Sequence, residues 1–148
     1  MYTIRVTPEG RLHAAASGRL STAEALRLAS QGFALADAGA ITDLVVDVRG
    51  VERGPGQWVV LGAVVASRMD GPMRLAVVAG PAQEPVVRRI LRYAGLRNRA
   101  AVVTTEEEAL RWFAGRFREH GREAALRPAA MEAAPGAFEA EGFRPRAG

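Results

Sequence analysis

The chain has 148 residues and contains no cysteine, no lysine and only two histidines, His13 and His120. Without cysteine there is no disulfide, no thiolate metal site and no cysteine nucleophile. Without lysine, a Walker-type phosphate loop lacks its cationic side chain. The two histidines lie far apart in the sequence, with no cluster of acidic residues beside either. We therefore expect neither a metal ion nor any other cofactor.

Long hydrophobic runs are also missing. No segment offers 18 uninterrupted apolar residues, so no membrane span is expected. The first five residues have no apolar signal core, which predicts a cytoplasmic protein. The net charge of +4 is modest, and we expect no nucleic-acid partner. Five arginines cluster around one predicted helix, where a solvated helix face explains them better than a phosphate-binding stripe: Arg88, Arg89, Arg92, Arg97 and Arg99.

Turn and capping signals divide the first third of the chain. Residues 2–6 and 11–17 are rich in strand formers and flank a turn, which predicts a hairpin. Ser21 and Glu24 form a capping-box pattern at the start of a helix, and Gly39 suits its end. The nearly continuous apolar run at 44–48 predicts a strand buried on both faces.

Residues 57–69 are ambiguous, because their valines favour a strand. However, 74–79 is another buried strand, and a parallel connection to it from 44–48 needs a crossover of a dozen or more residues. We therefore predict a helix over 57–69. A further helix before residue 94, a strand at 100–103 and a helix starting at Thr104 or Thr105 complete the order.

This order predicts an α/β fold with a mostly parallel sheet of about five strands, flanked by about four helices and carrying the N-terminal hairpin at its edge. We assign residues 1–118 to this domain. Residues 119–148 contain three interrupting prolines, and we predict a helix extension followed by a flexible tail.

The segment that follows the buried strand has a recognisable pattern. Asp47 ends the β-branched run, and a glycine-rich turn leads to the predicted helix. Asp47, Gly50 and Val51 match a signature of aspartate, any residue, serine, glycine and valine. The chain here resembles the STAS domains, the sulfate-transporter and anti-sigma-factor-antagonist family, over roughly residues 2–117.

The resemblance implies a STAS-like protein-interaction module. In STAS regulators, partner kinases phosphorylate a serine in this turn, but Pro55, Gly56 and Gln57 occupy the turn here. The phosphorylation switch is therefore missing. The implied partner is an anti-sigma-factor-like kinase or regulatory complex, or a second copy of the chain. The implied contact residues are Asp47, Gly50, Arg53, Gly54, Pro55, Gly56, Gln57 and Trp58.

Two roles are open for Asp47. At the C-terminal end of a strand an acid often contacts a substrate or ligand. It can equally accept backbone N–H groups in the turn at 49–56, as aspartates do, and we favour this structural role. A hydrolase or transferase using Asp47 would need a base, a nucleophile or a metal beside it, and nothing supplies one. We expect no enzymatic activity.

The predicted helix over 57–69 is more hydrophobic than a surface helix requires. Its apolar residues cover more than half of its circumference, whereas packing on a sheet needs one stripe. Neighbouring helices could bury the surplus. Otherwise it faces a second copy, another protein, or an apolar ligand between helix and sheet. The segment from Glu107 to Phe113 also resembles the SpoIIAA-like branch, some of whose members resemble lipid-carrier folds. The alternative function that this implies is a carrier of a lipid or other apolar ligand.

Overall fold

The computed structural model describes residues 1–69 and 71–115. The chain divides into two units, Met1–Trp112 and Phe113–Gly148. The domain boundary predicted after residue 118, and the helix extension and tail predicted beyond it, lie outside the described residues.

An N-terminal hairpin is followed by alternating helices and strands. The elements are β1 (Tyr2–Val6), β2 (Leu12–Arg19), α1 (Thr22–Gly39), β3 (Asp43–Arg53), α2 (Trp58–Arg68), β4 (Arg74–Val78), α3 (Glu84–Tyr93) and β5 (Ala100–Val103). Within the described residues a fourth helix begins at position 106 and continues to 115. None of the described helices has the length and apolar character needed to cross a membrane.

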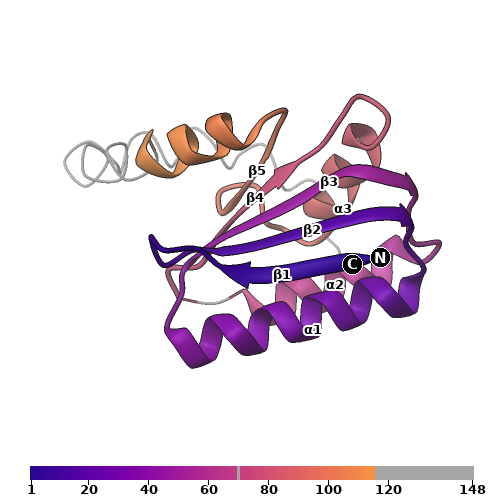
Figure 1. Cartoon of the computed structure of the whole chain (residues 1–148). Helices are drawn as coiled ribbons and strands as arrows, with labels where there is room; N and C mark the ends of the chain where they lie inside the picture. The colour runs from indigo at the N-terminus through magenta and orange to yellow at the C-terminus, as the bar shows by residue number, and fades with distance from the viewer. Residues whose placement is uncertain (70, 116–148) are drawn as a thin grey trace, which may run out of the picture. The chain divides into compact units, whose positions relative to one another are not determined.

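The five strands form one sheet in the order β1-β2-β3-β4-β5. β1 pairs antiparallel with β2, and the other neighbours are parallel. The predicted fold class, with its mostly parallel sheet and edge hairpin, is confirmed. Each crossover advances one strand in the same direction, and such connections are right-handed. The helices α1, α2 and α3 consequently lie on one face of the sheet, where α1 and α2 run side by side (Figure 1).

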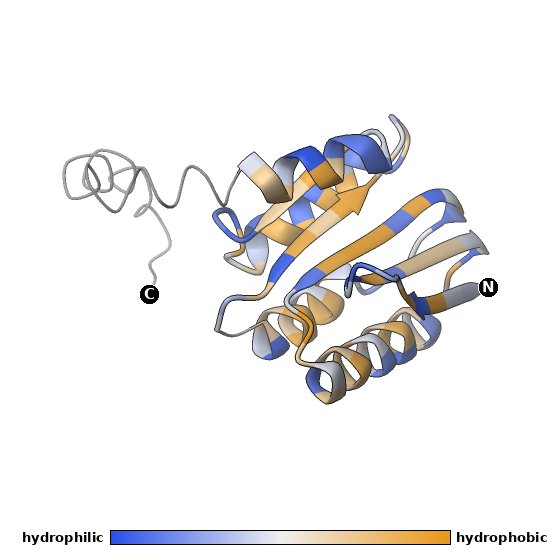
Figure 2. Cartoon of the chain, turned by 60° about the vertical axis from the view of Figure 1, so that its left-hand side comes forward, coloured by the Kyte–Doolittle hydropathy of each residue, from blue (hydrophilic) through white to orange (hydrophobic). Residues whose placement is uncertain are grey.

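The two faces of the sheet carry different side chains of β3. Successive residues of a strand point to opposite faces, so Val46 and Val48 face the three helices, whereas Val45 and Asp47 face away from them. The central strands are coloured mainly as hydrophobic in Figure 2. Val45 is 4% exposed, which shows that the face opposite α1–α3 is also largely buried at β3.

Helix α1 begins as predicted. The Glu24 N–H donates to Ser21 Oγ at 3.1 Å, and the Ser21 N–H donates to Glu24 Oε1 at 3.2 Å. The end differs from the prediction, because Gly39 is the last helical residue and Ala40 takes the left-handed conformation (φ 53°). The chain reverses at Ala40 so that the Ile41 N–H can donate to the Ala36 carbonyl at 2.8 Å.

Strand β3 is longer than predicted, and Asp47 lies inside it rather than at its end. Strand β2 continues to Arg19, and its last residues pair with Gly50, Val51 and Arg53 through two irregularities in register. This pairing keeps β3 extended well beyond the point where its pairing with β4 ends. The turn predicted over 49–56 is therefore shortened to residues 54–57.

The helical prediction for the valine-rich crossover is confirmed by α2, which has Gln57 and Met69 as its caps. One prediction about the arginines is wrong. Arg99 does not belong to a solvated helix face, because its guanidinium donates to the carbonyls of Met69, Gly71 and Met73. It thereby fixes the connection between α2 and β4.

Candidate functional site

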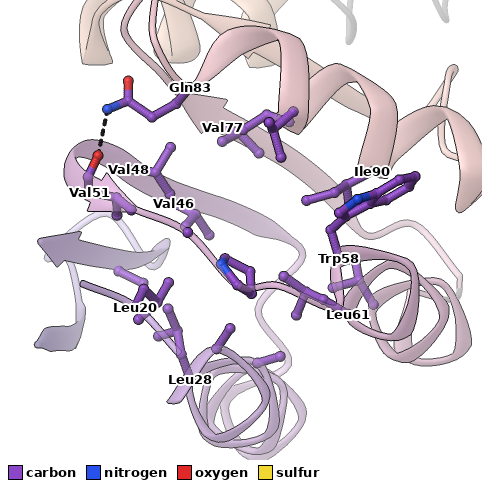
Figure 3. Close-up of a pocket in the computed structure, with 18 of the residues that line it drawn as sticks. Leu20, Leu28, Val46, Val48, Val51, Trp58, Leu61, Val77, Gln83 and Ile90 are labelled. Atoms are coloured by element: carbon purple, nitrogen blue, oxygen red, sulfur yellow. Dashed lines mark hydrogen bonds between the residues drawn. The ribbon is translucent and has the colours of Figure 1, made fainter. Parts of the chain in front are cut away.

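An apolar cavity of about 420 Å³ lies between the sheet and the helices α1, α2 and α3. Strands β2, β3 and β4 contribute its floor, and the inward faces of the three helices contribute its walls. Among the 26 lining residues, only Glu52 and Gln83 have polar side chains apart from the indole of Trp58. Figure 3 shows the side chains of Val46, Val48 and Leu61 converging on this space.

The cavity separates two parts of the hydrophobic core. One cluster surrounds Phe33 and Leu44, and the other surrounds Leu20 and Leu28. Val46 and Val48 are only partly buried and lie against both clusters. A domain core is normally packed like an organic crystal, so an open space at the junction of two clusters is a local exception that a bound molecule could fill.

Helix α2 borders the cavity and is held mainly at its sides. Gly62 is its only buried residue, and a Cβ placed there would lie 3.2 Å from the Ile90 carbonyl oxygen of α3. Arg68 bridges to α1, with its guanidinium 5.4 Å from the Phe33 ring and 3.3 Å from Asp37 Oδ2. Leu61, on the inward side of α2, is only half-buried and faces the cavity.

The outward side of α2 accounts for the rest of its hydrophobic surplus. Val59 is 52% exposed and Val60 is 42% exposed. The alternative that neighbouring helices bury the whole surplus is therefore wrong for the described part of the chain. The surplus is divided between an internal cavity and an external surface.

Three of the eight predicted contact residues line the cavity: Gly54, Pro55 and Trp58. Trp58 begins α2 and forms an edge-on contact with Tyr93 at a ring distance of 5.2 Å. The Arg89 guanidinium lies 5.6 Å from the Trp58 ring. These contacts join the start of α2 to α3.

The other turn residues have backbone roles. The Arg53 carbonyl accepts from the Leu20 N–H at 2.8 Å, and the Gln57 N–H donates to Thr22 Oγ1 at 3.1 Å. Gly56 is exposed. At Gly50 a Cβ would come within 3.1 Å of the Ser17 Cβ on β2, so the close strand approach favours glycine. Partner binding by these residues stays a prediction.

Asp47 is not brought to the cavity. It pairs with Arg49, whose Nη2 lies 2.7 Å from Oδ2 and whose backbone N–H donates to Oδ1 at 3.0 Å. Burial raises the pKa of the Asp47 carboxyl, but the side-chain and backbone hydrogen bonds from Arg49 outweigh burial and lower the pKa below its usual value. This is the structural role that the sequence favoured, placed on a strand instead of in a turn.

Sequence reasoning missed Gln83 and Glu52. Gln83 Nε2 donates to the Val51 carbonyl at 2.8 Å, and its Oε1 accepts from the Gly80 N–H at 2.9 Å (Figure 3). It thus ties the start of α3 to the end of β3 at the rim of the cavity. No sequence signal marked it, because the contact joins residues more than 30 positions apart. Within the described ranges, no group of histidine and acidic side chains could hold a metal ion.

Comparison with known proteins supports this architecture. No protein-family model and no curated protein matches the sequence. Among solved structures, the chain is similar to the anti-sigma factor antagonist SpoIIAA in its unphosphorylated form. The TM-score is 0.58 at 14% identity, and the match covers 78% of this chain and 99% of SpoIIAA. The fold is SpoIIAA-like.

A second SpoIIAA-like structure agrees with the first. It is an uncharacterised DUF3478-family protein from Shewanella loihica PV-4, with a TM-score of 0.51 at 16% identity, and the match covers 76% of this chain and 91% of that one. At these identities the SpoIIAA-like likeness establishes the fold alone. The predicted STAS-type architecture is confirmed, and function has to be argued from this chain's own residues.

Proposed function

We propose that this chain is a non-enzymatic binding module that holds an apolar molecule in the cavity beneath β3. The cavity itself is the observation that carries the proposal. Its volume of about 420 Å³ falls within the range of roughly 300–1,000 Å³ typical of small-molecule sites, and its lining is almost entirely apolar.

The size of the cavity argues that something fills it. A closed dry void costs about 24 cal/mol per Å³, so about 10 kcal/mol is the upper limit for leaving this open-mouthed cavity empty. That is comparable to the entire stability of a typical domain, about 5–15 kcal/mol. Water could enter, but walls with two polar side chains offer it few hydrogen bonds. An apolar ligand removes both penalties.

The polar groups elsewhere support a binding role rather than catalysis. Asp47 is committed to Arg49 and lies on the sheet face opposite the cavity. Within residues 1–69 and 71–115, no histidine, serine or threonine lines the cavity. A lining of this kind suits binding, because apart from Glu52 at its rim the described lining residues offer no side chain that could act as a nucleophile or a general base.

Native mass spectrometry of gently purified protein tests the proposal. The expected spectrum contains a population heavier than the chain by the mass of one small apolar molecule. Leu61→Ser, which places a hydroxyl in the cavity wall, should lose this population. Leu35→Ser is the matched control, because Leu35 is 43% exposed and does not line the cavity. A wild-type spectrum with only the bare mass, together with no uptake of added apolar dyes, would contradict the proposal.

A second candidate function is a STAS-type protein interaction through the outer side of α2. It is favoured by the exposure of Val59 and Val60 directly after the exposed turn. The SpoIIAA match is named as an anti-sigma factor antagonist, and the partner proposed here is an anti-sigma-factor-like regulator or a second copy. Since the turn at 54–57 has no serine, phosphorylation there would not control binding.

This second candidate can be tested without touching the cavity. Val60→Asp adds a charge to the outer side of α2, and Val60 does not line the cavity. Light scattering of the wild type should show a dimer, or affinity purification a stoichiometric partner, that Val60→Asp abolishes. Val6→Asp is the control, since Val6 is 49% exposed on the edge strand β1. If Val60→Asp leaves mass and partner recovery unchanged, the outer side of α2 is not the contact.

A further inference from the structure

We infer that Glu52 selects the head group of the bound molecule, so that the cavity takes an amphiphile with a neutral or cationic head and disfavours an anionic one. This inference rests on the proposed apolar-ligand function and adds the chemical class of the ligand. It follows from where the cavity opens and from which polar groups remain available there.

The exposed lining residues mark the entrance. Of the residues around the cavity, only Glu52, Gly54, Ala82 and Val86 are exposed, and the others are buried or half-buried. Glu52 and Gly54 belong to the end of β3 and the following turn, whereas Ala82 and Val86 flank the start of α3. The entrance therefore lies between the end of β3 and the start of α3.

Contacts at the start of α2 join it to both neighbouring helices. Towards α3, Trp58 makes an edge-on contact with Tyr93, and the Arg89 guanidinium lies over the Trp58 ring. Towards α1, the Gln57 N–H donates to Thr22 Oγ1 at 3.1 Å. An amphiphile that places its tail in the cavity thus brings its head to the segment containing Glu52.

Of the two polar side chains at the rim, Gln83 is already engaged. Its amide donates to the Val51 carbonyl at 2.8 Å and accepts from the Gly80 N–H at 2.9 Å (Figure 3). Glu52 is different, because in the described part of the chain no ion pair involves its carboxylate. It is also the only charged residue among the described residues that line the cavity.

Two of the nearby cations are already engaged in ion pairs. Arg49 is paired with Asp47 at 2.7 Å. Arg88 is paired with Glu84 at 2.7 Å. Arg89 lies over the outer ring system of Trp58, and Arg53, the neighbour of Glu52, does not line the cavity. Glu52 therefore carries the one lining charge at the entrance that no ion pair among the described residues neutralises.

A displacement assay tests whether Glu52 selects the head group. Three probes with the same dodecyl chain compete with a fluorescent apolar dye, N-phenyl-1-naphthylamine. The probes are dodecyltrimethylammonium, dodecanol and dodecanoate, each below its micelle concentration at neutral pH. We expect dodecanoate to bind about two- to fivefold more weakly than dodecyltrimethylammonium, the range that one exposed ion pair supplies. Glu52→Gln should remove the difference. Glu9→Gln, an exposed change in the β1–β2 turn, should leave it intact.

The outcomes separate the two proposals. If the dye and all three probes fail to bind, the apolar-ligand function itself is wrong. If the three probes bind equally, if dodecanoate binds best, or if Glu52→Gln leaves the ratio unchanged, the head-group inference is overturned while the apolar site stands. Because Glu52 is exposed, Glu52→Gln is not expected to affect folding, and a thermal melt checks this directly.

Discussion

Enlarging one side chain in the floor of the cavity should distinguish a real space from an ordinary core. Val46 and Val45 are neighbours in β3, and both are valines in the same central strand. Val46 lines the cavity, whereas Val45 is 4% exposed and points to the other face. The substitutions Val46→Phe and Val45→Phe thus make the same chemical change in two different environments.

The two substitutions should change the free energy of unfolding differently. Overpacking a filled core costs typically about 1–3 kcal/mol, which is the loss expected for Val45→Phe. At Val46 the added ring has a space of about 420 Å³ to enter, although Val46 also lies against both core clusters. It also covers apolar surface at about 25 cal/mol per Å². Val46→Phe should therefore leave the free energy of unfolding unchanged or raise it by up to about 1 kcal/mol.

Urea unfolding of ligand-stripped protein measures both changes, and dye titration measures ligand uptake. Val46→Phe should weaken uptake of N-phenyl-1-naphthylamine, because the ring occupies the same volume, while Val45→Phe should bind the dye normally when folded. If Val46→Phe lowers the free energy of unfolding by about 1–3 kcal/mol, as Val45→Phe does, the floor is packed and the cavity is not an open space.

Three further outcomes test local features. Arg49 lowers the folded-state pKa of Asp47, so the stability that Asp47 contributes to the fold is fully present above the unfolded pKa of about 4 and is lost as the pH falls through the folded pKa. The urea midpoint of the wild type should drop over this acidic range, and Asp47→Asn should flatten that dependence. Ser21→Ala removes the capping box of α1 and should cost about 1 kcal/mol in the same assay; an unchanged midpoint would mean that the cap contributes nothing. Ala40→Gly relieves a left-handed conformation and should stabilise by about 0.5–1 kcal/mol, whereas Ala34→Gly within α1 should destabilise by about 1 kcal/mol; equal signs for the two would contradict the geometry at Ala40.

Element types were predictable wherever a local signal and a length constraint agreed. The helix over 58–68 is an example, because valine content alone favoured a strand while the parallel connection required a crossover. The extension of β3 past Asp47 was not predictable. Gly50 resembles a turn residue, and only the matching length of β2 keeps the backbone extended there.

The site was partly predictable for a different reason. The hydrophobic surplus of α2 is a count of side chains around a helix, and it correctly indicated that packing on the sheet could not use all of them. The sequence contains no comparable pattern for the distance between α2 and the sheet. It depends on how α2 rests on α1 and α3, and contacts such as Gly62 against Ile90 join residues far apart in the chain. Glu52 and Gln83 became site residues only through that arrangement.

Side-chain size explains why the space opens where it does. On the side of α1 and β2, four of the seven described lining residues are small: Ala14, Ala25, Ala29 and Gly32. At Gly32 an added Cβ would approach Leu12 Cδ2 at 3.3 Å, so α1 already lies close to β2 at this residue. On the other side, α2 is held at its contact with Ile90 of α3. With both helices fixed against larger neighbours, the volume that the small residues leave stays open, and a bound apolar molecule is the simplest way to stabilise it.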